Sequence, residues 1–103
     1  MSDQRSVSTW WLYIIQSRDG KFYTGISTDV ERRFNEHTGS ANGAKSKGAK
    51  ALRGKSPLKL VYQSLVGNRS KAQKIEYKVK RLTKAEKESL VKSQQAIIDF
   101  LKL

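Results

Sequence analysis

The first strong hydrophobic segment of the chain is a run of six apolar residues, 10–15, rich in aromatic and β-branched side chains. A run this short with this composition is typical of a β-strand. The Asp-Gly pair at 19–20 predicts a hairpin turn, because glycine adopts positive φ without steric cost. Residues 22–26 then alternate between two faces, which predicts the return strand and places Tyr23 and Gly25 on the same face.

Helix starts are marked by capping boxes, in which a hydroxyl residue is followed three positions later by Glu or Gln. Three such pairs occur: Thr28 with Glu31, Ser70 with Gln73, and Thr83 with Glu86. The first of these helices should end near His37, with Gly39 as its stop. The second should bury one apolar stripe at helical spacing. Its members are Ala72, Ile75, Val79 and Leu82.

A long loop and a third strand connect the first two helices. Residues 39–56 contain four of the seven glycines and little apolar material, which indicates a basic loop, and long loops in small domains are usually functional or mobile. Pro57 opens a strand in which Leu58, Leu60 and Tyr62 should share one face. The resulting order, β-β-α-β-α-α, predicts an α+β domain with a small antiparallel sheet covered by helices.

Chain length and composition narrow the organisation. A chain of 103 residues fits one compact domain, which we place at residues 10–92, after an N-terminal tail (1–9) and before a helical extension (93–103). With 29% charged residues, we expect no transmembrane helix and no membrane partner. The chain has no cysteine, which excludes disulfides and thiol chemistry and agrees with a cytoplasmic location.

The formal net charge of +12 is distributed unevenly. Residues 1–44 hold five basic and five acidic residues, whereas residues 45–103 hold sixteen basic and four acidic ones. Such asymmetry favours a polyanionic partner, nucleic acid first, over a merely solvated basic surface. The predicted phosphate contacts are the basic residues of the long loop: Lys45, Lys47, Lys50, Arg53 and Lys55.

Two tripeptides resemble a known signature. Trp11-Leu12-Tyr13 and Tyr23-Thr24-Gly25 stand about ten residues apart and look like the two motifs that name the GIY-YIG nuclease superfamily. The segment from Tyr23 to His37 resembles its strand-to-helix segment. The resemblance covers roughly residues 10–92 and is closest to the small stand-alone bacterial members, which are similar to the N-terminal domain of the excinuclease C repair subunit.

The resemblance implies a three-stranded antiparallel sheet with flanking helices and hydrolysis of phosphodiesters with one divalent metal ion, Mg²⁺ or Mn²⁺. By position, Glu76 would ligate the metal and Arg33 would bind the scissile phosphate. Tyr13 or Tyr23 would help to activate water, and His37 would assist proton transfer or phosphate positioning. An anionic phosphodiester repels hydroxide, so a metal and a guanidinium at the developing charge suit this reaction.

Two further details concern that site. The same resemblance implies that Gly25 would let the backbone approach closely. A tyrosine has an ordinary pKa of about 10, so we expect nearby cations such as Arg33 to lower it if a tyrosine is the base. Tyr13 is the preferred base, although the hairpin register that separates it from Tyr23 is open at this level.

Each of these residues also has a purely structural interpretation. The tyrosines could be cross-strand packing residues, and His37 a helix residue favoured by the dipole. Arg33 could pair with Asp29, and Glu76 with a lysine one turn later.

We expect an endonuclease acting on DNA, in repair or recombination, with a protein partner that directs its specificity. The alternatives are a non-catalytic basic nucleic-acid-binding module and a protein associated with RNA or the ribosome.

Overall fold

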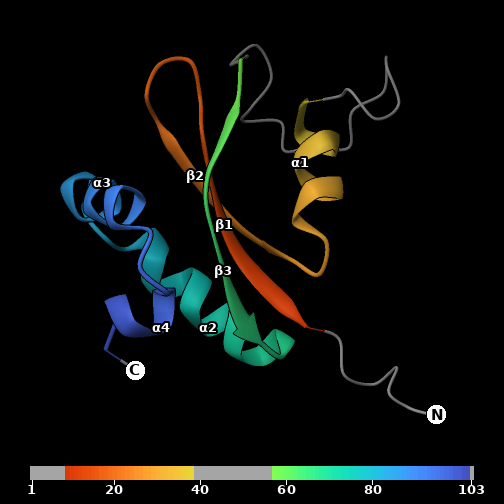
Figure 1. The fold of residues 1–103 in the computed structure, drawn as a ribbon, viewed down its shortest axis with the longest axis vertical. Coiled ribbons are helices and arrows are strands. Elements are labelled where there is room, and N and C mark those ends of the chain that lie inside the picture. Colours follow the sequence, from red (N-terminus) through yellow and green to blue (C-terminus); the bar gives the residue numbers. More distant parts are fainter. Residues whose placement is uncertain (1–8, 39–56, 103) are drawn as a thin grey trace.

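The computed structural model describes residues 9–38 and 57–102. The strands are β1 (Trp10–Gln16), β2 (Phe22–Ser27) and β3 (Lys59–Gly67), and they form one antiparallel sheet in the order β2-β1-β3. The helices are α1 (Val30–Thr38), α2 (Arg69–Lys80), α3 (Lys84–Ser93) and α4 (Ile97–Phe100). Figure 1 shows α1 on one side of the sheet and α2, α3 and α4 on the other. The predicted α+β class and element order are therefore confirmed.

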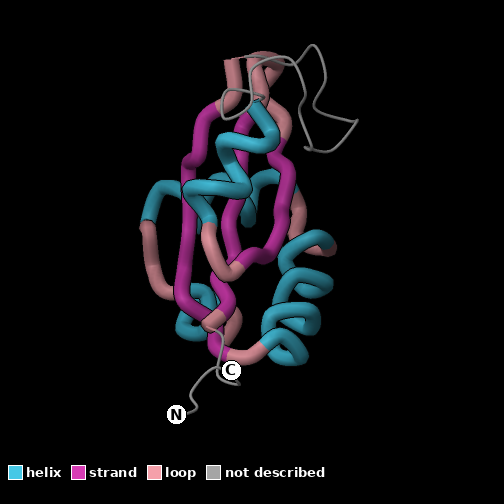
Figure 2. The backbone as a smooth tube through the Cα atoms, turned by 90° about the vertical axis from the view of Figure 1, so that its right-hand side faces the viewer, coloured by secondary structure: helices cyan, strands magenta, loops and turns pink. Residues whose placement is uncertain are grey.

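The central strand β1 is apolar on both faces because helices cover both. Leu12 and Ile14 are completely buried on the side of α2, α3 and α4. Tyr13 and Ile15 pack on the opposite side against Val30 of α1, which crosses the sheet in Figure 2. Two-sided burial explains why this strand appears as a continuous hydrophobic run. Successive residues of β1 therefore serve two different layers.

Two of the three predicted helix caps are displaced by one or two residues. The carboxylate of Asp29, rather than Thr28, accepts the amide hydrogen bond three residues later, at 3.0 Å. The side chain of Asn68, rather than Ser70, caps α2 in the same way, at 2.8 Å. Asp and Asn are at least as effective as Ser and Thr at this position. The third capping box, at the start of α3, is present with both of its hydrogen bonds.

The third strand contains an irregularity that the alternation pattern did not reveal. Ile14 of β1 pairs with Tyr62, but the next residue, Ile15, pairs with Leu60, so the register shifts by one. As a result Leu58 and Leu60 pack on the α1 side, while Tyr62 is buried on the other side. The prediction that these three residues share a face is wrong, because a bulge adds one residue and reverses the alternation.

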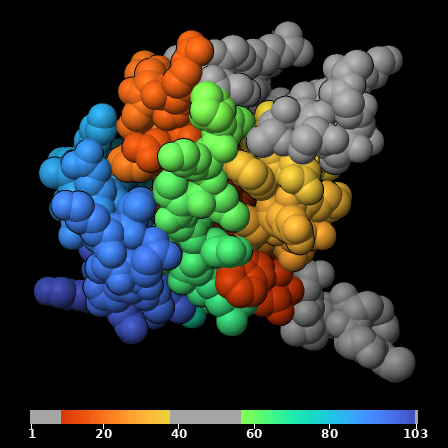
Figure 3. Space-filling model, turned by 45° about the horizontal axis from the view of Figure 1, so that its top comes forward, coloured from red at the N-terminus to blue at the C-terminus, as the bar shows by residue number. Residues whose placement is uncertain are grey.

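The C-terminal segment closes the larger core. The helix predicted over 96–103 is only four residues long, but Ile97 at its start is fully buried and its amide donates to Ser64 Oγ at 3.0 Å. Figure 3 shows β3, in green, exposed at the surface between α1 and the C-terminal helices. Among the helices of the described ranges, none is long and apolar enough to cross a membrane.

Candidate active site

A cavity of about 420 Å³ lies at the edge strand β2 and is lined from both faces of the sheet. We call it the catalytic cavity. It gathers all six residues that the sequence indicated for chemistry: Tyr13, Tyr23, Gly25, Arg33, His37 and Glu76. They come from β1, β2, α1 and α2. The predicted phosphate contacts of the long loop lie outside the described residues.

The strand register places the Tyr13 ring across Gly25. These two residues are direct partners between β1 and β2, and Tyr23 pairs with Ile15 further along. A Cβ atom added at Gly25 would stand 2.5 Å from Tyr13 Cζ and closer still to its hydroxyl. Only glycine therefore leaves room for the ring. In this structure, the group that approaches Gly25 closely is the ring of Tyr13.

Helix α1 directs two side chains to the Tyr13 hydroxyl. Arg33 and His37 lie one turn apart, so they share a helical face. His37 Nε2 is 3.1 Å from the Tyr13 hydroxyl oxygen. Arg33 Nη1 is 3.0 Å from Glu36 Oε1, an ion pair that orients the guanidinium. The alternative pairing of Arg33 with Asp29 is wrong, because Asp29 pairs with Arg32 at 3.8 Å.

Burial sets the protonation states of Tyr13 and His37. Burial raises the pKa of Tyr13 above its ordinary value of 10.0 and outweighs the opposing charge of Arg33. The expected effect of a neighbouring cation is present, because the charge of Arg33 and its hydrogen bond both lower the pKa of Tyr13, but burial raises that pKa by more. Burial, together with the Arg33 charge, lowers the pKa of His37 below 6.5, although Glu36 opposes the shift. At neutral pH the site thus holds a protonated tyrosine beside a neutral imidazole.

The His37 titration is directly measurable, because His37 is the only histidine. We expect NMR to give a midpoint below 6.5, and Arg33→Gln to move it upward. The sign follows because the substitution removes a repelling cation and the shorter of the two ion pairs of the Glu36 carboxylate, and both changes favour the imidazolium. Arg32→Gln removes an equal charge one residue away and should shift the midpoint much less. A midpoint unchanged in Arg33→Gln would contradict this geometry.

Glu76 reaches the cavity from the opposite face of the sheet. Its side chain is 24% exposed, and its carboxylate is 3.3 Å from Lys80 Nζ. The contact expected between Glu76 and the lysine one turn later is therefore present. The carboxylate also raises the pKa of Tyr13 by its charge, although less than burial does. The negative charge of Glu76 therefore reaches Tyr13 across the cavity.

The donor set at Glu76 is compatible with a weakly chelated hard cation. Within residues 9–38 and 57–102, no group of three His, Cys, Asp or Glu side chains could enclose a metal. Mg²⁺ is often held by one or two carboxylates plus waters and substrate phosphates, so one carboxylate facing a cavity suffices. Thr24 also lines this cavity, and its Oγ1 is buried without a hydrogen-bond partner among the described residues.

Sequence reasoning missed three contributors to this site. Glu36 orients Arg33, and Thr24 and Lys87 line the cavity. The i,i+3 spacing from Arg33 could have indicated Glu36. No local pattern places Lys87 of α3 beside β2, because that contact depends on how α3 packs.

Comparison with known proteins agrees with this geometry. Residues 9–89 match the family described as the GIY-YIG catalytic domain. The UPF0213 protein YhbQ of Escherichia coli (strain K12) is 48% identical over 95 residues, covering 92% of this chain and 89% of that protein. YhbQ of Salmonella arizonae is 49% identical over 96 residues, with the same coverage.

A solved structure is also similar. The solution NMR structure of the UPF0213 protein BH0048 from Bacillus halodurans shares 37% identity, covers 84% of this chain and 85% of that one, and has a TM-score of 0.51. The resemblance stated from the two tripeptides is confirmed. The chain belongs to the GIY-YIG catalytic domain family, a nuclease superfamily, alongside small stand-alone bacterial proteins of the YhbQ type.

Proposed function

We propose that this protein is a divalent-metal-dependent endonuclease that hydrolyses phosphodiester bonds of DNA. The observation that carries the proposal is the convergence of side chains from both faces of the sheet. Tyr13, Arg33 and His37 meet on one side of the catalytic cavity and Glu76 lines it from the other. A nucleophile-activating pair, a phosphate-binding cation and an oxygen ligand for a metal are the groups that this reaction needs.

The carboxylate of Glu76 would hold the metal, Mg²⁺ or Mn²⁺. Such an ion would supply positive charge to the phosphate oxygens as charge develops on them. Arg33 binds a non-bridging oxygen of the same phosphate, in the orientation that its contact with Glu36 provides. Lys80 and Lys87 attract the flanking backbone.

Tyr13, rather than Tyr23, is the general base. Its hydroxyl lies within hydrogen-bond distance of His37 Nε2, and a neutral imidazole protonated on Nδ1 accepts a proton there. As the attacking water gives its proton to the Tyr13 oxygen, Tyr13 passes its own to His37. A new bond forms between the water oxygen and phosphorus, the bond to the leaving oxygen breaks, and that oxygen takes a proton from solvent. This relay requires no free tyrosinate, which the raised pKa of Tyr13 disfavours.

The substrate context extends the proposal. The positive charge of the second half of the chain and the fold family both favour nucleic acid, and we assign DNA with a role in repair or recombination in the cytoplasm. A cavity of about 420 Å³ with no added DNA-reading domain in the described ranges offers few contacts for sequence specificity. A protein partner that directs the enzyme to its substrate would supply this specificity.

A cleavage assay tests this function. Purified protein is incubated with Mg²⁺ or Mn²⁺ and with single-stranded, duplex, nicked or branched DNA, or with RNA. We expect metal-dependent cleavage that a chelator stops and that Arg33→Gln reduces by about 100-fold or more, the typical cost of losing one charge-stabilising group. If no substrate is cut with either metal, the proposal fails and the binding-module interpretation replaces it. Cleavage of RNA alone would overturn the assignment to DNA.

A further inference from the structure

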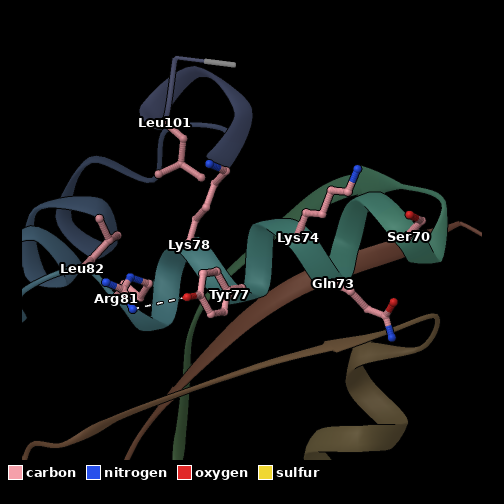
Figure 4. A pocket seen from close by; sticks show the side chains of 8 residues that line it. All are labelled: Ser70, Gln73, Lys74, Tyr77, Lys78, Arg81, Leu82 and Leu101. Carbon is pink, nitrogen blue, oxygen red and sulfur yellow. Dashed lines mark hydrogen bonds between the residues drawn. The ribbon is translucent and has the colours of Figure 1, made fainter.

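A second and larger hollow, of about 870 Å³, lies on the outer side of α2, away from the sheet. We call it the α2 groove. Its lining residues are Ser70, Gln73, Lys74, Tyr77, Lys78, Arg81, Leu82 and Leu101. Figure 4 shows most of them projecting from α2, with Leu101 facing Lys78 from the C-terminal segment. None of these residues takes part in the proposed chemistry.

Tyr77 is the notable feature of the α2 groove, because a large aromatic ring is left 63% exposed. The ring is held in place by Arg81, one helical turn later. The guanidinium carbon of Arg81 is 5.4 Å from the ring centroid, and its Nη1 donates to the Tyr77 hydroxyl at 3.3 Å. These contacts limit the motion of the ring, and although the guanidinium lies over one face, Tyr77 stays largely exposed. The helix therefore presents an oriented aromatic platform to the exterior.

The charge around Tyr77 is of one sign. Lys74, Lys78 and Arg81 line the groove, and its lining includes no acidic side chain. Neither lysine forms an ion pair with any residue that the structure describes. The acid of α2, Glu76, points to the catalytic cavity and pairs with Lys80. The cations of the groove are thus uncompensated beside an exposed ring, which complements a ligand that is both anionic and aromatic.

We propose that the α2 groove binds single-stranded nucleic acid. An unpaired base stacks on Tyr77, while Lys74 and Lys78 contact the backbone phosphates. Base–aromatic stacking and a basic path are the two elements of single-strand binding. A duplex could use the lysines but not the ring, because its bases are already stacked. An acidic peptide would likewise leave the ring without a specific partner.

The position of the groove relates it to the catalytic cavity. Glu76 and Tyr77 are consecutive, so their side chains leave α2 about 100° apart. The arc between them is roughly 10 Å for a helix of this diameter. A strand that passes out of the catalytic cavity therefore needs to cross only the side of α2 to reach Tyr77. The inference rests on the proposed function in one respect, that the ligand of this chain is nucleic acid.

The test measures binding separately from cleavage. The full chain carrying Glu76→Gln is titrated, without metal, into labelled strands of about 12 nucleotides of DNA or of RNA, and into a DNA duplex, with fluorescence anisotropy as readout. Adding Tyr77→Ala should weaken single-strand binding by about tenfold and leave duplex binding unchanged. Tyr77→Phe keeps the ring and should restore most of the affinity. Leu65→Ala, which truncates another exposed apolar side chain on β3, is the matched control.

The proposed phosphate contacts of Lys74 and Lys78 are tested by removing the two charges. The pair Lys74→Ala and Lys78→Ala should lower the salt dependence of single-strand binding, by up to about 1.4 in the slope of log K against log salt. The pair Lys92→Ala and Lys102→Ala removes the same charge elsewhere and should change it less.

The outcomes separate this inference from the proposed function. If Tyr77→Ala binds single strands as tightly as its parent, or loses single strand and duplex equally, the inference is wrong, whatever the cleavage assay shows. A selective single-strand loss supports it even if wild-type protein cuts nothing. The single strand, DNA or RNA, whose binding Tyr77→Ala weakens more is identified as the ligand of the α2 groove.

Discussion

The Glu76→Gln variant is expected to lose metal-dependent cleavage by at least about 100-fold, because the loss of even an outer-shell partner of a metal ligand costs about 10- to 100-fold. Glutamine keeps the size of the side chain but lacks the negative charge that a divalent cation requires. The measurement is kcat/KM on the best substrate across a range of Mg²⁺ concentrations. Excess metal should recover little of the activity.

Stability distinguishes this role from that of a structural ion pair. The contact between Glu76 and Lys80 is a helical pair near the surface, and such pairs contribute about 0.5 kcal/mol or less. Glu76→Gln should therefore unfold at nearly the same denaturant concentration as the wild type. Lys80→Gln breaks the same pair but keeps the carboxylate. If Glu76→Gln and Lys80→Gln both cleave at the wild-type rate, Glu76 is a structural residue and its proposed role as metal ligand is wrong.

Glu88→Gln provides a control for the change in charge. Glu88 is an exposed carboxylate on α3 that lies outside the catalytic cavity. Its removal raises the net charge by the same amount as the removal of Glu76. We expect cleavage to stay at the wild-type rate, so a loss confined to Glu76→Gln cannot come from net charge.

The Gly25→Ala variant should lose both stability and activity, although it adds only one methyl group. The added Cβ would stand 2.5 Å from Tyr13 Cζ, so the ring must move. Overpacking of this kind costs about 1–3 kcal/mol of unfolding free energy. A displacement of about 1 Å in a reacting group can lower the rate by about 100-fold. Denaturant unfolding and kcat/KM measure the two effects.

A double-mutant cycle assigns the Gly25 effect to its cause. In a Tyr13→Ala background the ring is absent, and Gly25→Ala should then cost no stability or even increase it slightly. A Tyr13→Phe background should not relieve the clash, because Cζ remains. If Gly25→Ala destabilises all three backgrounds equally, Gly25 is needed for another reason. The proposed packing of Tyr13 across β2 would then be wrong.

The fold could be predicted from the sequence wherever the signal was local. The Asp-Gly hairpin is present, with Gly20 at a φ of 84°. The stripe on α2 is buried at Ala72, Ile75 and Val79. Where two neighbouring polar residues competed for a cap, local pattern was insufficient, because several candidates could satisfy the same amides. The bulge in β3 was invisible for a different reason, since alternation counts residues and a bulge adds one.

The candidate site shows the same division. Arg33 and His37 were placed on one helical face because helical spacing is local. That this face meets Tyr13 depends on α1 packing on one particular side of the sheet. The lowering of the Tyr13 pKa by Arg33 was predicted, but the larger rise caused by burial was not, because the depth of burial is not legible in a sequence. In a buried site, burial shifts a pKa more than the neighbouring charges do.

By itself, therefore, the sequence determined the order of elements, the family, the surplus of positive charge and the residue types available for chemistry. Tertiary structure alone decided which of them meet. The pairing of β1 with β2 set Tyr13 across Gly25, and the packing of α1 and α2 on opposite faces brought His37 and Glu76 into one cavity. The reason is physical: periodicity reports which face of an element is apolar, but not which surface that face will cover.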